Sequence, residues 1–338
     1  MKYFKFLLSY FYCLIILIIF SSITYSQTTI KFATLAPEGT NWVKVLREFA
    51  KDIEAQTKGN IKFKIYTGGV QGDEKDIIRK IKIGQIHASG FTGVGLGEIA
   101  KEIRVLDTPF LFKNYEEIDY IYLKFDKEFR NIFEKNGFVL LGWSEIGDVY
   151  LLSKKIVTKP SDFSNLKLWA WEGDPIALKT FENYGTKPIP LSIADVMTSI
   201  QTGMIDSVYA TPATIIPLGW HTKMVYLLDM PITYASGAVL ISKKIFDKLS
   251  EDEQKIIINL SKKHFSNLNK IAREDNKKAI ELLKSKLKVL KPQNIKEFEE
   301  LSKKAREKLT SIYGKEILEK IEKTLFEFRN AKTKNNKN

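Results

Sequence analysis

The sequence predicts an α/β protein built from two similar lobes. One observation is a β-α-β-α-β order of expected elements across residues 29–91, which is typical of a sheet covered by helices. A second is that this order recurs from Phe138 onward, without visible sequence repetition. A third is a long helical stretch that starts at the capping box Ser250–Glu253 and continues toward Leu287, longer than an average globular helix. A length of 338 residues accommodates two such lobes.

The N-terminus has the pattern of an export signal. Lys2 and Lys5 precede an apolar run over residues 6–20, and small residues follow it up to Ser26. We therefore expect a cleavable signal peptide over residues 1–26, with a retained N-terminal anchor as the alternative. The run is too short to argue for a membrane span. Cys13, the only cysteine, lies within it, so the mature chain would lack disulfides, zinc–thiolate sites and cysteine nucleophiles.

The first lobe is expected to form a parallel sheet. Apolar residues in the second expected element follow helical spacing at Val45, Leu46, Phe49 and Ile53, whereas residues 61–66 alternate as a strand does. In order, we expect the strand 29–35, the helix 42–57, the strand 61–66, the helix 73–83 and the strand 86–91. Residues 92–97 follow as a glycine loop whose spacing differs from that of nucleotide-binding loops. This loop follows a strand's carboxyl end, where open α/β sheets bind ligands.

The rest of the chain continues the alternation. Residues 105–112 are apolar and aromatic, which favours a packed segment. We then expect the helix 115–135, the strands 138–143 and 149–152, the strand 166–171, the helices 176–184 and 193–202, and the strand 207–210. The long helix from residue 250 precedes a strand at 288–290 and the helices 294–313 and 315–330. A polar tail, 331–338, is expected to be disordered.

The stretch Leu166–Pro175, LKLWAWEGDP, is the most informative segment. Trp169 and Trp171 are two residues apart, so in an extended chain both indoles point to one face. A turn with two carboxylates, Glu172 and Asp174, follows at once. Such a strand can form one wall of a ligand cleft, or it can be buried with its tryptophans in the core.

Sequence patterns for catalysis and metal binding are missing. There is no H-E-x-x-H, no G-x-S-x-G and no EF-hand loop. His87, His221 and His264 show no metal-ligand spacing, although His221 follows Trp220 and could line a cleft. The net charge of +13 comes from lysines interleaved with glutamates, which favours solvated helix faces over a nucleic-acid partner. These observations favour an exported binding protein without catalytic residues, metal or cofactor.

Six segments of the chain match one family pattern in order. They are KFATLAPEGTNW, GGVQGDEKDIIRKI, DTPFLF, DFSNLKLWAWEGDP, IADVMTSIQTGMIDSVYATP and MPITYASGAVLISKKIFDKLSEDEQ. Together they resemble the solute-binding subunits of TRAP transporters, the DctP-type family, and the resemblance covers Thr28 to about Phe328. It implies a two-lobed, class II-like periplasmic-binding-protein fold with a hinged cleft and a helix spanning both lobes. Lobe I would comprise residues 27–143 and 231–270, and lobe II residues 144–230 and 271–330. It also implies a periplasmic protein that delivers a small organic solute to small and large membrane permease subunits.

One departure from the family pattern concerns the ligand. Members commonly carry an arginine that pairs with the solute's carboxylate, and Trp169 stands at the matching position. Thr211 likewise replaces the asparagine of a later Asn-Pro pair. One hypothesis is therefore a neutral, aromatic or cationic solute that contacts Trp169 or Trp171. The other is an organic acid held by a different basic residue, Arg79 or Arg104.

The predicted ligand-binding residues come from both lobes. They are Glu38, Trp42, Thr92, Gly93, Trp143, Glu145, Trp169, Trp171, Glu172, Tyr209, Thr211 and Trp220. Two other functions remain open at this point: a sensor module that presents its ligand to a membrane receptor, and an exported enzyme using Glu38, Glu145 or Glu172 as an acid or base.

Overall fold

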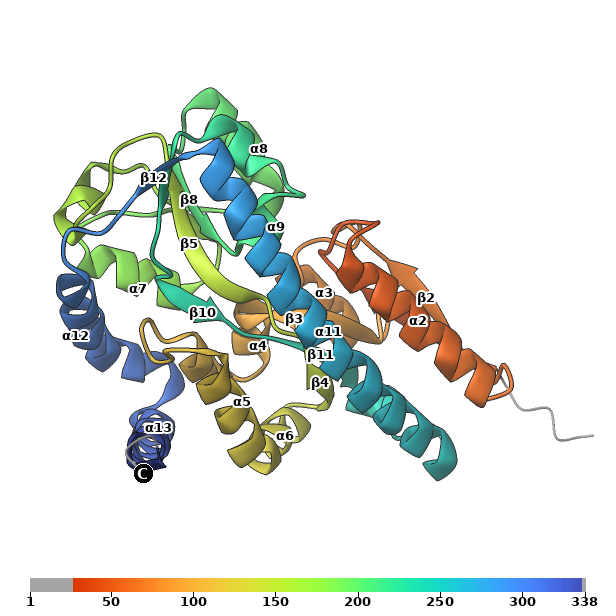
Figure 1. Cartoon of the computed structure of the whole chain (residues 1–338). Coiled ribbons are helices and arrows are strands. Elements are labelled where there is room, and N and C mark those ends of the chain that lie inside the picture. Colours follow the sequence, from red (N-terminus) through yellow and green to blue (C-terminus); the bar gives the residue numbers. More distant parts are fainter. Residues whose placement is uncertain (1–26, 336–338) are drawn as a thin grey trace, which may run out of the picture.

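The computed structural model describes residues 27–335 of the chain. The predicted signal peptide, residues 1–26, and the last three residues of the predicted tail, 336–338, lie outside this range. Figure 1 shows two sheet-containing lobes crossed by one long helix. Among the described residues, no helix combines the length and the apolar character needed to span a membrane.

The sheet of lobe I has five strands in the order β2-β1-β3-β11-β4. β1 pairs in parallel with both β2 and β3, as the β-α-β-α-β order predicts. β11 comes from much later in the chain and lies antiparallel between β3 and β4. The strands are β1 (Thr28–Ala33), β2 (Ile61–Tyr66), β3 (Ala88–Thr92), β4 (Phe138–Trp143) and β11 (Gly237–Ser242).

Helices cover the strands of this sheet. α2 (Asn41–Gln56) buries the apolar stripe Val45, Leu46, Phe49 and Ile53 against the sheet, because these residues repeat at helical spacing. A second core cluster contains residues of α3 (Glu74–Lys82), α5 (Tyr115–Lys124) and α6 (Asp126–Lys135). The expected single helix 115–135 is therefore two helices, which meet at the buried Phe125.

The sheet of lobe II is built around β5 (Gly147–Ser153) and is mainly antiparallel. β5 pairs antiparallel with three strands, and β12 pairs in parallel with β9. β6 and β7 pair in parallel as a separate two-stranded sheet, and a parallel bridge joins Leu168 to Ser207. The recurring β-α-β-α-β order therefore does not make the main sheet of lobe II parallel. The strands are β6 (Trp169–Trp171), β7 (Ile189–Leu191), β8 (Ser207–Ala210), β9 (Tyr226–Leu228), β10 (Thr233–Ala235) and β12 (Lys288–Leu290). The α-helices are α7 (Pro175–Asn183), α8 (Val196–Thr202) and α9 (Pro212–Ile215).

The long helix α11 (Glu251–Lys286) joins the two lobes, as predicted (Figure 1). Ser250 caps it through the expected capping box with Glu253. Its Phe265 is in the core of lobe I and its Leu283 is in the core of lobe II. α11 packs against α2 in one lobe and against α9 in the other, so it fixes one side of the space between them.

The C-terminal helices differ from the predicted division of lobes. α12 (Ile295–Tyr313) places Phe298 in a lobe II cluster, but its end and α13 (Lys315–Asn335) contribute residues such as Tyr313 to the lobe I core. We therefore propose that α13 belongs to lobe I, although the sequence assigned residues 271–330 to lobe II. α13 also continues through Asn335, so residues 331–335 of the predicted tail are helical.

The glycine run after β3 also differs from its predicted structure. Residues expected to form a loop form the helix α4 (Gly93–Ile99), capped by the Thr92 hydroxyl, which accepts from the N–H of Val94. Gly95 leaves no room for a side chain, because an added Cβ would lie 2.5 Å from the Glu74 carboxylate. The glycines therefore let this helix approach a buried acidic side chain, which a sequence pattern alone does not reveal.

Candidate ligand-binding cleft

A cavity of about 760 Å³ lies between the two lobes. Lobe I supplies residues from the segment after β1, from β3 and from the starts of α2 and α3, and lobe II supplies residues from β6, α7 and β8. α11 closes it with Leu268, Ile271, Ala272, Asp275 and Asn276. A cavity of this size is within the range of small-molecule sites in proteins.

Most of the predicted site residues meet at this cavity. It is lined by Trp42, Thr92, Gly93, Glu145, Trp169, Trp171, Tyr209, Thr211 and Trp220. The structure places three others outside it: Glu38, Trp143 and Glu172. Glu38 is exposed and pairs with Arg47 at 2.7 Å, and Glu172 is exposed in the turn after β6. Trp143 stacks on Tyr122 within the lobe I core, with ring centroids 4.2 Å apart. His221 is also absent from the lining.

An aromatic wall forms the lobe II side of the cavity. Trp169 stacks on Tyr209 and meets Trp220 edge-on, and in each pair the ring centroids are 5.2 Å apart. The ring centroids of Trp169 and Trp171 are 6.2 Å apart. Trp169 is only 2% exposed, and its Nε1–H donates to the carbonyl of Leu191 at 3.0 Å. Its single donor is thus used within the protein, and Trp169 offers the cavity an aromatic surface. The sequence left two interpretations of Trp169, a buried core residue or part of a cleft wall. In the structure it is buried in the core and also lines the cavity.

Trp42 faces the cavity from lobe I. It lies in the first turn of α2, and its ring rests on the backbone of Gly90 in β3. A Cβ at position 90 would be 2.5 Å from that ring, so only glycine allows this contact. Aromatic side chains therefore line the cleft from both lobes.

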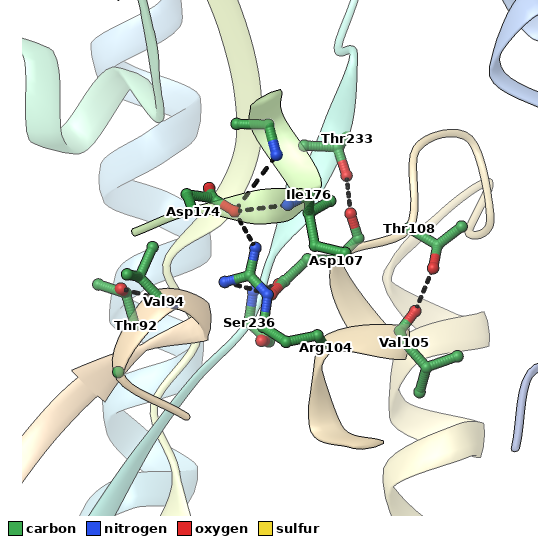
Figure 2. Close-up of polar contacts among 12 residues, drawn as sticks. Thr92, Val94, Arg104, Val105, Asp107, Thr108, Asp174, Ile176, Thr233 and Ser236 are labelled. Carbon is green, nitrogen blue, oxygen red and sulfur yellow. Dashed lines mark hydrogen bonds and ion pairs between the residues drawn. The ribbon is translucent and has the colours of Figure 1, made fainter. Parts of the chain in front are cut away.

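Polar side-chain contacts cross the cleft between the lobes. The Nε1–H of Trp171 in lobe II donates to Oδ2 of Asp73, the N-cap of α3 in lobe I, at 3.1 Å. Arg104 of lobe I reaches Asp174 of lobe II, with Nη2 2.6 Å from Oδ1 (Figure 2). Arg104 lies in the 3-10 helix η1 (Lys101–Asp107), and Asp174 caps α7 by accepting from the N–H groups of residues 176 and 177.

The Arg104 pair is part of a buried ionic cluster. Nη1 of Arg104 lies 3.3 Å from Oδ2 of Asp107, and Oδ1 of Asp107 accepts the N–H of Ser236 at 2.7 Å. Arg104 is 4% exposed, Asp107 5% and Asp174 7%. Burial raises the pKa of Asp107, whereas the Arg104 guanidinium acts to lower it. Sequence reasoning missed Asp107, and it noted Asp174 in the turn after Trp171 without including it among the predicted ligand-binding residues. The Asp-Pro pair that opens α7 signals a helix cap but does not reveal an ion pair.

Glu74 is a further buried acid at the lobe I side of the cavity. Its carboxyl group accepts from the N–H and the hydroxyl of Thr92 and from the N–H of Gly95, at 2.7, 2.9 and 2.6 Å. Burial outweighs these hydrogen bonds and raises its pKa to about 8.

Two further polar residues of the lining, Glu145 and Asn276, have structural partners. Glu145 is buried and held by Arg273 of α11, whose Nε lies 2.8 Å from Oε2. Asn276 of α11 donates to the carbonyl of Ile146 and accepts the N–H of Ala213. Among residues 27–335, no group of three or more His, Cys, Asp or Glu side chains is placed to hold a metal ion.

Residues 32–312 match the family model for bacterial extracellular solute-binding proteins, family 7. The match covers most of the chain and both lobes. The chain belongs to this family. A role as an extracellular solute-binding protein is consistent with the two lobes, the spanning helix and the cavity between them.

Individual relatives of this solute-binding protein are distant in sequence but close in fold. A solute-binding protein of Verminephrobacter eiseniae is 25% identical over 265 residues, covering 77% of this chain and 78% of the relative. The sugar acid binding protein of Advenella mimigardefordensis, solved with galactonate, is 23% identical, with a TM-score of 0.84 and coverage of 89% and 99%. A TRAP solute-binding protein from Polaromonas, bound to D-erythronate, is 21% identical, with a TM-score of 0.81 and coverage of 88% and 98%.

Proposed function

We propose that this protein captures a small organic solute between its two lobes and delivers it to the membrane subunits of a TRAP transporter. The observation that carries the proposal is the cavity of about 760 Å³, which both lobes and α11 line together. A solute in this position contacts both lobes at once, so binding favours the closed arrangement over an open one. The family of the chain supports the same role.

The proposed place of action is the periplasm. The basic start and apolar run of residues 1–26 support export through a cleavable signal peptide. The mature protein would then meet its solute outside the cytoplasmic membrane and dock on the permease from that side. Small and large membrane subunits of TRAP type are the proposed partners.

Binding without chemical conversion is the proposed mode of action. A general acid or base must be within hydrogen-bond reach of its substrate. Of the carboxylates considered for this role, Glu38 and Glu172 lie outside the cavity, and Glu145 is bound to Arg273. The lining therefore offers aromatic surface and buried charge for recognition.

The proposal is tested by measuring solute uptake. Proteoliposomes that contain the membrane subunits of the same transporter should accumulate labelled solute only when the mature chain, residues 27–338, is added. A variant that fills the cleft, Ala177→Trp on the cavity-lining side of α7, should abolish both binding and uptake. Solute binding with no uptake, together with capture by a membrane receptor, would favour a sensor role. Conversion of the bound solute would indicate an enzyme.

A further inference from the structure

The charges around the cavity are predominantly negative. Of the charged residues that line it, seven are acidic and one is basic, Arg104. The acidic residues are Asp73, Glu74, Asp76, Asp107, Glu145, Asp174 and Asp275. This excess is opposite to what a carboxylate ligand would require, because like charges in a poorly solvated site repel strongly.

Two of these acids are compensated by arginines of the protein itself. Glu145 pairs with Arg273, and Asp76 pairs with Arg79. Asp275 and Asp73 accept hydrogen bonds from the neutral groups of Asn41 and Trp171, so they add to the negative charge of the lining. The buried cluster around Arg104 adds to it further.

That cluster holds two carboxyl groups and one guanidinium. Asp107 and Asp174 share Arg104. Asp174 has the short contact of 2.6 Å, whereas Asp107 has the longer one of 3.3 Å. Oδ2 of Asp107 is buried and has no hydrogen-bond partner among the described residues. A buried carboxylate with an incomplete set of partners is unfavourable, and an added cation would relieve it.

Neither arginine of the organic-acid hypothesis is free to anchor a carboxylate. Arg79 lies outside the cavity, with its side chain 75% exposed and its guanidinium on Asp76. Arg104 lines the cavity, and Asp107 and Asp174 already pair with its Nη1 and Nη2, which leaves only its buried Nε–H without a hydrogen-bond partner among the described residues. An anionic solute would have to displace one of them and leave it buried without its partner.

Aromatic faces complete the environment of a cation. Trp42 lines the cavity from lobe I, and Trp169, Trp171 and Tyr209 line it from lobe II. The faces of aromatic rings carry partial negative charge and attract ammonium groups, most strongly where water is excluded.

We propose that the solute of this protein is an organic cation whose ammonium or quaternary ammonium group is held between Asp107 and the aromatic side chains of the cleft. This inference rests on the proposed solute-binding function and specifies the ligand class of the same cavity. It separates this chain from the relatives solved with galactonate and D-erythronate, whose ligands are anions.

The test compares matched probes of opposite or no charge by isothermal titration calorimetry. Choline is paired with its uncharged carbon analogue 3,3-dimethylbutan-1-ol, 2-phenylethylamine with phenylacetate, and cadaverine with glutarate. A panel of further cationic and anionic metabolites is screened by thermal shift. We expect the cationic members to bind at least about tenfold more tightly than their partners. Binding of anions but not of cations overturns the inference and leaves the solute-binding function intact. Binding of no probe at all counts against both.

Asp107→Asn removes the charge and keeps the oxygen that accepts from Ser236. We expect this variant to bind the best cationic probe about tenfold more weakly and to bind its neutral partner unchanged. Glu182→Gln, on the exposed side of α7 and outside the cavity, removes the same charge and should change neither affinity. If Asp107→Asn fails to fold, Trp42→Leu is measured, and it should weaken the cation more than the neutral analogue. Equal losses for both probes in these variants overturn the inference.

Discussion

Arg104→Met tests the buried ionic cluster that joins the lobes. Methionine keeps the length of the aliphatic side chain, which packs against Gly97, and removes the guanidinium. Asp107 and Asp174 then remain buried without their cation. Removing one partner of a buried pair destabilises a protein strongly, so we expect the free energy of unfolding to fall by about 3–5 kcal/mol at neutral pH.

The loss should depend on pH in a definite direction. Without Arg104, the pKa of Asp107 in the folded state rises further above its unfolded value, because burial then acts without the opposing positive charge. A carboxyl group with a raised folded-state pKa holds its proton in the folded state after the unfolded state has released it. Stability is therefore lost as pH rises from the unfolded pKa toward the raised one, and the deficit of the variant should be smaller at pH 5 than at pH 8.

Urea unfolding followed by circular dichroism at pH 5 and pH 8 measures both effects. Arg47→Met is the matched control, since Arg47 and Glu38 form a pair of nearly the same length, 2.7 Å, with side chains 50% and 59% exposed. Solvent-exposed pairs contribute little, so this variant should be hard to distinguish from the wild type. Equal losses for Arg104→Met and Arg47→Met, or a deficit in Arg104→Met that does not grow with pH, would refute the reasoning.

Three further variants test other parts of the cleft. Trp171→Phe removes the donor to Asp73 across the cleft, so the solute-free protein should open, and small-angle X-ray scattering should give a larger radius of gyration; an unchanged radius would contradict this. Because the pKa of Glu74 is about 8 against 4.5 when unperturbed, the wild type should lose thermal stability as pH rises between these values, and Glu74→Gln should flatten that slope; parallel pH profiles would count against it. Gly90→Ala places a Cβ 2.5 Å from the Trp42 ring, so it should reduce the free energy of unfolding by about 1–3 kcal/mol and weaken solute binding. Calorimetry measures both quantities, and an unchanged affinity would show that solute binding does not need Trp42.

Much of the fold could be predicted because its signals are local. The apolar spacing predicted the helix 42–57, which matches α2 to within one residue at each end. The capping box at Ser250 likewise predicted the start of α11. The antiparallel insertion of β11 between β3 and β4 could not be predicted, because strand neighbours distant in the chain leave no periodic pattern.

The candidate site was predicted in part, for a related reason. Aromatic residues at a strand end marked Trp169 and Trp171, both of which line the cavity. The same reasoning wrongly placed Trp143 there, because a pattern shows that a side chain is apolar but not which partner buries it. Arg104 and Asp174 are 70 positions apart, and in the sequence they resemble the many exposed charges of this chain.

The central claim is that a solute binds between the two lobes at the aromatic and acidic cavity. A crystal structure of the protein purified with the solute that it retains tests this most directly. We predict density for one small molecule between Trp42 and Trp171, with a cationic group near Oδ2 of Asp107. A solute whose carboxylate pairs with Arg104 would contradict the inferred ligand class. A solute bound outside the cavity would contradict the claim itself.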